Sequence, residues 1–375
     1  MGETAMSVRV KKNSWVDAVK GIATCSVLMI HSGANSLPGV MGKIGAAGSR
    51  GVQIFYVVSA CLVFASLARY DQERNGGQMQ GGGYRQWWIR KLLRLLPLYY
   101  AALLLSRIFS RAGESYWLGS LSGVSASNMI AHILLLHGLV PHYINSVMGI
   151  EWYLGNLVLF YCMAPFLYRR INSLEKSICF FLLTAPGSGL LNHAVSFLIP
   201  ETDAYIYESY IGSLWIFTQL PVMAGGICLY HFLRRTDDMK IWENRRALSY
   251  CLLLFCVCMI WGEIDGKNQL FGVAGHVLFT IWSIGIMLSQ VLHPLPLVCN
   301  VFFQKIGQNS YGIYLFHWLI IKLYTEHMAF RTGNPYWDWG IRFVFALALS
   351  YGASVIAERL IGRPVLLMTS KRKRE

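Results

Sequence analysis

The first apolar segment of the chain carries three ionisable residues, Asp17, Lys20 and His31. In a helix turning about 100° per residue, the eleven-residue separation returns Lys20 and His31 to within about 20° of each other. Asp17 lies one turn before Lys20 and is placed to pair with it. An imidazole titrates near neutrality, so His31 on this stripe has the chemistry of a general base. The alternative is a packed polar seam that contains a hydrogen-bonded core histidine.

A second cluster consists of Arg90, Lys91 and Arg94, at the entry of a later apolar segment. In a helix these residues share one side, and Arg94 continues into apolar sequence where its long side chain must snorkel toward water. Three converging cations suit a polyanion such as the phosphates of coenzyme A. Ordinary membrane-topology signals also explain such a cluster, and the spacing alone leaves both interpretations open.

The composition indicates that these residues belong to a membrane protein. Hydrophobic residues make up 55% of the 375 and charged residues 14%, and the mean hydropathy is +0.43. A soluble domain carries nearer a quarter charged residues. The net charge of +14 comes from short basic clusters between apolar stretches, which is typical of the positive-inside rule. We therefore expect membrane lipids, and no nucleic acid, as surroundings.

Eleven apolar segments are candidate spans. They lie at residues 16–33, 47–68, 92–109, 129–140, 152–168, 177–199, 212–232, 247–262, 270–290, 301–323 and 340–361.

The number of membrane crossings before each loop, odd or even, decides on which side of the membrane that loop lies. If all eleven crossed, Arg169, Arg170 and every later basic cluster would lie on the outer side, against the positive-inside rule. The segment 129–140 is too short to span and holds two histidines, so we expect it to be re-entrant or interfacial on the outer side. The sequence thus predicts an all-α polytopic protein, a single transmembrane domain over 1–375. It has about ten transmembrane helices and short basic tails, 1–14 and 363–375, both cytoplasmic.

The N-terminus also has features of a signal peptide. Basic residues precede an apolar run that ends in the small residues Ser32-Gly33-Ala34. The ionisable residues within the run are not needed in a signal peptide, so we expect a retained span.

Six motifs follow one another along nearly the whole chain. They are DAVKGIA at 17–23 followed by His31, GVQIFYVVS at 51–59, RKLLRLLPLYY at 90–100, LHG at 136–138 with NS at 145–146, WYL at 152–154 and SYGIYLFH at 310–317. In the same order they resemble "LDGLRGIA…H", "GVDLFFVLSG", "RRLLRILPLYY", "LHG…NS", the tryptophan helix that follows and "SYSIYLWH". These are motifs of the membrane-bound acyltransferase 3 family, which acylates bacterial surface glycans.

The resemblance implies roles for the two clusters. It makes His31 catalytic and Lys20 functionally important, and it assigns Lys91 and Arg94, with Arg90 beside them, to acyl-CoA. Lysine stands at 20 and 91 where the family has arginine. The positive charge is kept, but the ability of a guanidinium to bind an anion through two N–H groups at once is lost.

Further positions are candidates to contact or support the substrates. Many family members have a glutamate in the helix that begins at Trp152, where this chain has Leu157 and Val158; Glu151 is the possible substitute. The remaining candidates are His317, Trp152, Asn145 and Ser59. For His317, packing between helices is the alternative. His132, His137 and His142 recur every five residues, which no helix face maintains, so we expect no metal site.

The expected reaction moves an acyl group, in the first instance acetyl, from cytoplasmic acyl-CoA to a hydroxyl of a surface glycan or lipid-linked sugar. His31 would be the general base or would form an acyl-histidine, and Lys20, positioned by Asp17, would orient His31 or stabilise the oxyanion. Acyl-CoA is a co-substrate, with no permanently bound cofactor. The expected location is the bacterial inner membrane.

A transporter of a lipid-linked sugar or small solute, with His31 as proton relay, is the alternative function. The sequence shows no internal repeat of the kind common in transporters, which argues against it. It does not identify the acceptor, the acyl chain or the oligomeric state.

Overall fold

The computed structural model describes residues 14–76, 83–109, 123–199, 209–237, 245–265, 273–328, 330–362 and 364. The predicted tails 1–14 and 363–375 lie outside these ranges except for Ser14 and Pro364. All regular structure among the described residues is helical, so the all-α prediction is confirmed.

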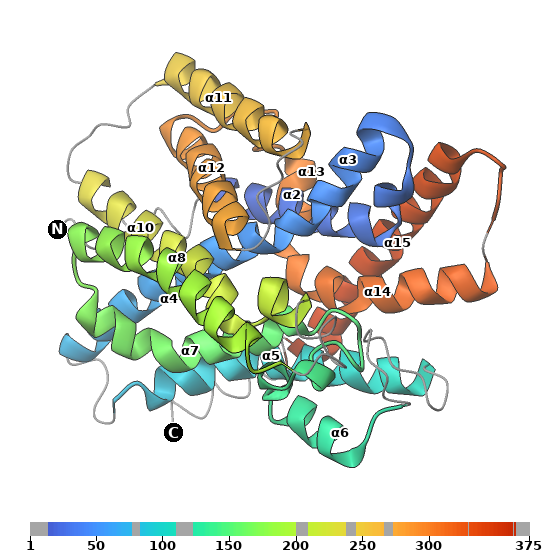
Figure 1. The fold of residues 1–375 in the computed structure, drawn as a ribbon, viewed down its shortest axis with the longest axis horizontal. Helices are drawn as coiled ribbons and strands as arrows, with labels where there is room; N and C mark the ends of the chain where they lie inside the picture. The colour runs from blue at the N-terminus through green and yellow to red at the C-terminus, as the bar shows by residue number, and fades with distance from the viewer. Residues whose placement is uncertain are drawn as a thin grey trace. The chain divides into compact units, whose positions relative to one another are not determined.

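The long helices follow the predicted apolar segments in chain order (Figure 1). They are α2 (Ser14–His31), α4 (Gly51–Asn75), α5 (Arg85–Phe109), α7 (Trp152–Arg170), α8 (Leu174–Ser196), α10 (Ile216–Asp237), α11 (Arg246–Asp265), α12 (Val273–Leu292), α14 (Ser310–His327) and α15 (Pro335–Ala357). Shorter elements are α3 (Gly39–Ala47), α6 (Ala126–Ile133), α13 (Val301–Gln308), the 3-10 turns η1 (Ala34–Ser36), η2 (Gly48–Arg50), η3 (His137–Leu139) and η4 (Pro141–Tyr143), and the π-helices η6 (Tyr210–Leu214) and η7 (Glu358–Gly362).

The structure differs from the predicted segments at two places. Residues 301–323 form two helices, α13 and α14, because Asn309 between them leaves helical geometry and its carbonyl accepts a hydrogen bond from Ser354 Oγ (3.1 Å). Residues 129–140 hold only the end of α6 and η3. The eight residues of α6 are about 12 Å long, far short of a ~30 Å hydrocarbon core.

Seven helices of the described part are long and apolar enough to cross a membrane, so the chain is a polytopic membrane protein. The seven run over 39–75, 85–109, 174–196, 210–236, 246–264, 273–292 and 335–362. The predicted total of about ten would need α2, α7 and α14 as well, which are 18 or 19 residues long. These three stay predicted spans.

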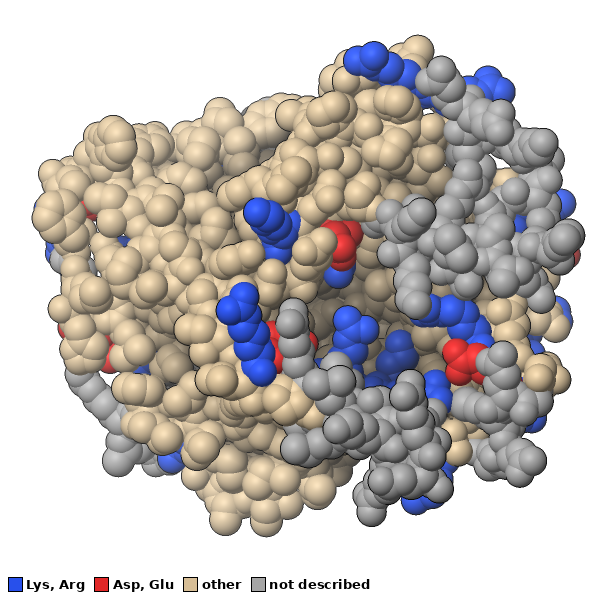
Figure 2. Space-filling view, turned by 180° about the vertical axis from the view of Figure 1, so that it is seen from behind, with Lys and Arg blue, Asp and Glu red and all other residues tan. Residues whose placement is uncertain are grey.

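The outward faces of α8 and α11 are apolar. Leu182, Leu183 and Leu190 of α8 are exposed, as are Leu254 and Phe255 of α11. Figure 2 shows a face on which most side chains are neither acidic nor basic. Exposed apolar side chains such as these five are costly in water and are satisfied by lipid.

The contacts divide the chain into two compact units, each assembled from three stretches of sequence. The first unit contains residues 1–23, 50–80 and 156–307, and the second contains 24–49, 81–155 and 308–375.

In the first unit α10 packs against α4, α8 and α12, and α11 packs against α12 (Figure 1). Gly226 makes the approach of α10 to α4 possible, because a Cβ there would overlap the backbone of Val57. Phe64 of α4 is fully buried and meets Tyr168 and Tyr230 edge to face, with ring centroids 5.6 and 5.7 Å away.

In the second unit α14 packs against α15 and α5. The Tyr311 hydroxyl of α14 donates to the Leu95 carbonyl of α5 (2.8 Å), two residues before Pro97. Gly312 faces Ser354 of α15 so closely that a Cβ would overlap it. These contacts fix α14, which carries His317.

Candidate active site

Two histidines meet in the second unit. His31 is the last residue of α2, and His317 lies fully buried on α14. His31 Nδ1 is 2.7 Å from His317 Nε2, and the two rings are nearly parallel (2°) with centroids 5.0 Å apart. The rings are therefore joined nitrogen to nitrogen, edge to edge.

The partners of His317 set the direction of this hydrogen bond. His317 Nδ1 is 2.7 Å from the Tyr314 carbonyl and 3.2 Å from that of Ile313. A carbonyl only accepts, so Nδ1 carries the hydrogen and, in the neutral ring, Nε2 is an acceptor. His31 Nδ1 then donates to it, which leaves His31 Nε2 as an unprotonated nitrogen. No described residue hydrogen bonds to His31 Nε2.

The indole of Trp318 closes one side of His31, edge to face, with ring centroids 4.9 Å apart. Gly149 lies against this indole. Its φ is +83°, a left-handed conformation that favours glycine, and a Cβ there would collide with Trp318. Any larger residue at 149 would displace the indole that packs on the histidine.

Side chains of α15 hold the C-terminal end of α2. Arg342 Nη1 donates to the Ser32 carbonyl (3.3 Å), and Trp339 Nε1 donates to the Met29 carbonyl (3.4 Å). Arg342 Nε is buried and has no hydrogen-bond partner among the described residues. An arginine within a candidate span is costly, so Arg342 is a functional candidate that the sequence reasoning missed.

Glu151 organises the connection between α6 and α7. Its carboxylate is buried and accepts backbone N–H bonds from Val147 (2.8 Å), Met148 (3.0 Å) and Ile150 (2.9 Å). It also lies 3.0 Å from His132 Nε2. The carboxylate is therefore fully engaged in holding its own loop. The prediction that it substitutes for the family's glutamate stays a prediction.

His132 and His137 stack face to face, with ring centroids 4.3 Å apart and planes 9° apart. His137 Nε2 donates to the Glu151 carbonyl (3.1 Å). Burial lowers the pKa of His137 to about 4. Burial alone would raise the pKa of Glu151, but the hydrogen bond from His132 and the nearby backbone amides outweigh it and hold this pKa below its ordinary value.

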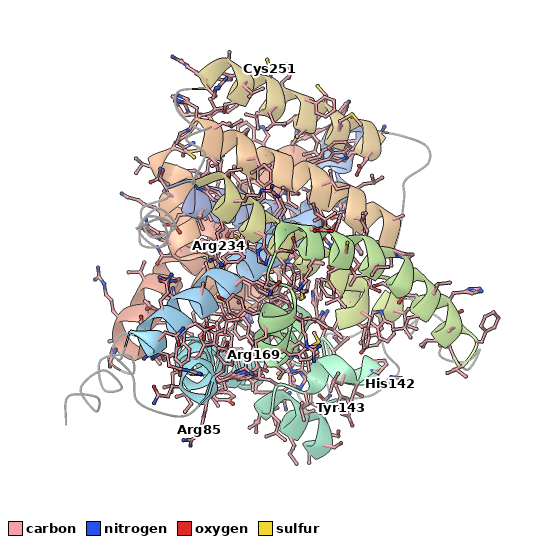
Figure 3. The ribbon with its side chains drawn as sticks, turned by 90° about the vertical axis from the view of Figure 1, so that its left-hand side faces the viewer. Arg85, His142, Tyr143, Arg169, Arg234 and Cys251 are labelled. Carbon is pink, nitrogen blue, oxygen red and sulfur yellow. The ribbon has the colours of Figure 1, made fainter. Side chains whose placement is uncertain are left out.

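The same connection is joined to its neighbours by further hydrogen bonds. Tyr99 and Tyr100 of α5 donate to the carbonyls of His132 (3.1 Å) and Ile133 (2.8 Å). Ser127 of α6 bonds the hydroxyl of Tyr143 (3.0 Å), which lies beside His142 in Figure 3. The segment is thus a packed part of the second unit.

The other predicted support residues lie in different places. Asn145 Oδ1 accepts from the Trp152 backbone N–H (3.2 Å), so this pair holds the first residue of α7. Ser59 lies on α4 in the first unit.

Arg90, Lys91 and Arg94 all lie on α5, which Arg85 begins (Figure 3). Arg90 and Arg94 are exposed, and the half-buried Lys91 places its ammonium 5.5 Å from the centre of the Trp87 ring. The described residues contain no acidic partner within salt-bridge distance of Arg94.

Asp17 and Lys20 form an ion pair of 2.8 Å in the first unit. The pairing predicted from their spacing is confirmed. α2 is continuous from Ser14 to His31, so Lys20 and His31 stand about 16 Å apart along its axis. Lys20 therefore does not touch His31, and its predicted role in the reaction stays a prediction.

The site thus consists of a hydrogen-bonded pair of histidines in a polytopic membrane protein. A family model described as an acyltransferase domain matches residues 13–359, so the chain belongs to the acyltransferase 3 family, as its motifs predict.

The sequence is also similar to those of three known proteins. The chain is 23% identical over 366 residues to peptidoglycan O-acetyltransferase OatA of Listeria monocytogenes, covering 93% of this chain and 55% of that protein. It is 24% identical over 369 residues to a putative peptidoglycan O-acetyltransferase of Bacillus subtilis, covering 89% and 52%. It is 21% identical over 313 residues to a putative acetyltransferase of Acidianus two-tailed virus, covering 81% and 82%.

The chain thus spans about half the length of the two bacterial relatives. No solved structure matches it.

Proposed function

We propose that this chain is an O-acyltransferase that moves an acetyl group from cytoplasmic acyl-CoA to a hydroxyl of a surface glycan or lipid-linked sugar. A glycan acceptor is supported by the names of the two bacterial relatives, one a peptidoglycan O-acetyltransferase and the other a putative one. The observation that carries the proposal is the free Nε2 of His31 at the end of the His317–His31 hydrogen-bond chain.

In this mechanism His31 Nε2 takes the proton of the acceptor hydroxyl while the oxygen attacks the thioester carbonyl. The carbon–sulfur bond then breaks, and the proton passes from His31 to the departing thiolate of coenzyme A. His317 acts as a positioning residue, because its acceptor nitrogen orients His31 and stabilises the imidazolium formed during the reaction. An acyl-histidine intermediate would use the same nitrogen as nucleophile.

Arg90, Lys91 and Arg94 would bind the phosphates of the donor. Arg90 and Arg94 are exposed on α5, and Arg94 has no acidic side chain within salt-bridge distance among the described residues, which leaves its guanidinium available to a phosphate. Lys20 and Asp17 enter the proposal as an intramembrane ion pair on α2, the helix that ends at His31.

The proposed arrangement has ten spans, with the seven candidate helices joined by α2, α7 and α14. Both termini would face the cytoplasm of a bacterial inner membrane, and α6 with its following turns would lie on the outer side.

The test uses membrane vesicles that contain the full chain, acetyl-CoA radiolabelled in the acetyl group, and peptidoglycan fragments or lipid-linked sugar as acceptor. The proposal expects alkali-labile label on the acceptor, because esters of hydroxyls hydrolyse readily in base. Movement of unmodified acceptor across the membrane, with no label transferred, would instead support a transporter.

A further inference from the structure

The turn that ends α2 at His31 bonds only partly to itself. The last carbonyls of an α-helix have no N–H partner within the helix and need donors from elsewhere. The Ser32 N–H and hydroxyl both bond the Leu28 carbonyl (2.8 and 2.6 Å), and the Gly33 N–H bonds the Ile30 carbonyl (2.9 Å). Two other carbonyls of the same turn are bonded from outside it.

Both outside donors are side chains of α15. Trp339 Nε1 donates to the Met29 carbonyl (3.4 Å). Arg342 Nη1 donates to the Ser32 carbonyl (3.3 Å). The two donors are three residues apart on α15 and therefore share one face of that helix. Met29 lies two residues before His31 and Ser32 lies directly after it, so α15 holds the backbone on both sides of the histidine.

The guanidinium of Arg342 is packed against the turn that follows His31. Gly33 has a φ of +90°, which favours glycine, and a Cβ there would come within 3.2 Å of Arg342 Nη1. The acidic residue one turn earlier on α15, Asp338, accepts from the backbone N–H and hydroxyl of Thr332 (2.6 and 2.7 Å). The hydrogen bonds of Asp338 therefore do not account for the direction of the guanidinium.

The place of His31 in its helix explains why such support matters. His31 is the last residue of α2, and helix ends fray. Its Nδ1 nevertheless lies 2.7 Å from His317 Nε2, a contact that depends on the position of the last turn. A displacement of a reacting group by about 1 Å can lower a rate about 10²-fold.

We propose that Arg342 and Trp339 are positioning residues that fix His31 for acyl transfer by holding the carbonyls of Ser32 and Met29. A cation at this point is also favoured by the dipole of α2, whose C-terminal end is partly negative. The expected effect on rate rests on the proposed function. The expected effect on the histidine pair does not, because that pair is observed without substrate.

The variants remove the two donors one at a time. Arg342→Met keeps a long side chain without a donor, and Arg342→Lys restores a cation with N–H groups. Trp339→Phe keeps an aromatic ring without the N–H. Tyr336→Phe is the matched control, because it removes a hydrogen bond from α15 to the Pro38 carbonyl (3.2 Å), beyond the turn that ends α2. Thermal unfolding of each variant checks that it is folded.

The first readout is steady-state acetyl transfer per folded protein. Arg342→Met should lower kcat about 10- to 100-fold, and Trp339→Phe about fivefold, as the loss of one neutral hydrogen bond does. The KM for acetyl-CoA should stay near wild type, Arg342→Lys should recover part of the loss, and Tyr336→Phe should change neither constant. A merely structural role would lower the amount of folded protein and leave kcat per folded molecule unchanged.

The second readout is NMR of the full chain with isotope-labelled histidine, in lipid nanodiscs and without substrate. The proton between His31 Nδ1 and His317 Nε2 is identified by its loss in His317→Leu. Arg342→Met and Trp339→Phe should speed the exchange of this proton with solvent, since they loosen the turn that holds His31. Tyr336→Phe should leave the exchange unchanged.

The two readouts separate this inference from the proposed function. Unchanged exchange in both Arg342→Met and Trp339→Phe, or equally fast exchange in Tyr336→Phe, would overturn the inference. A kcat of Arg342→Met within about threefold of wild type would overturn it as well. A wild-type protein that transfers no acetyl group would contradict the proposed function, and proton exchange alone would then decide whether α15 positions His31.

Discussion

At the scale of single residues, the account depends on a chain of hydrogen bonds that starts at the Tyr314 carbonyl and ends at His31 Nε2. Each link fixes the next, because the carbonyl sets the tautomer of His317 and His317 sets that of His31. A carboxylate has the same effect on the histidine of a serine hydrolase triad. Here a second imidazole supplies the acceptor.

His317 can therefore be tested separately from His31. His317→Leu removes the acceptor and should lower kcat about 10- to 100-fold, since His31 then loses its orientation. His317→Gln offers an amide oxygen near the position of Nε2 and should recover part of the loss. The acidic limb of the pH profile of kcat/KM should move in the leucine variant and return toward wild type in the glutamine variant.

A role for His317 in packing alone predicts another result. Leucine would then be tolerated at least as well as glutamine, and the pH profiles of both variants would match that of the wild type.

The cations of α5 give a second residue-level prediction. Arg94→Ala should raise the KM for acyl-CoA about five- to a hundredfold with little change in kcat, because a phosphate contact far from the thioester contributes mostly uniform binding. Lys91→Arg restores the family's residue and should preserve or tighten donor binding. Unchanged donor affinity with a weaker acceptor in Arg94→Ala would place the cluster on the other substrate.

At the scale of elements, the connection from α6 to α7 is held by one buried carboxylate. Glu151 gathers backbone amides of Val147, Met148 and Ile150, with His132 and His137 stacked beside it. In the same stretch Gly149 makes room for Trp318, which packs on His31. The shape of this loop thus bears on the position of the histidine pair.

The loop should make the protein sensitive to acid. The pKa of His137 is about 4 in the folded protein against an ordinary 6.5, so between these values the unfolded chain binds a proton that the folded chain does not. Stability is therefore lost as pH falls from 6.5 to 4, by up to about 3 kcal/mol. Glu151, with its lowered pKa, adds to the loss below about its ordinary value of 4.5.

The measurement is the unfolding temperature in detergent at pH 7.5 and pH 5. His137→Gln keeps an N–H donor for the Glu151 carbonyl but does not titrate, so its unfolding temperature should fall less over this range. Parallel curves for the two proteins would exclude His137 as the cause.

The sequence predicted the elements well and the tertiary contacts only in part. Apolar runs located every long helix, because burial in lipid requires about 20 apolar residues whatever their partners. The sequence did not predict the helix break at Asn309, whose carbonyl is bonded by Ser354 of another helix. The contact between His31 and His317, which are 286 residues apart, could not be predicted from residue spacing. Only the family resemblance singled out both histidines as candidates. No motif or spacing in the sequence singled out Arg342 as a functional candidate.

At the scale of the whole molecule, the proposed orientation makes distinct loops accessible from each side. Single cysteines in a cysteine-free chain at 112–128 and 200–210 should react with an impermeant reagent from outside. Cysteines at 71–85 and 236–244 should react only after the membrane is opened. Labelling of 236–244 from outside would mean that the segment 129–140 crosses the membrane.

The central claim is that His31 performs the chemistry of acyl transfer, and its replacement tests this most directly. The measurement is the rate of acetyl transfer from labelled acetyl-CoA to the glycan acceptor by His31→Ala, in vesicles that contain as much folded protein as the wild type. A general base contributes at least about 10²-fold, so the account predicts a loss of that size or greater. A rate within about threefold of wild type would contradict it.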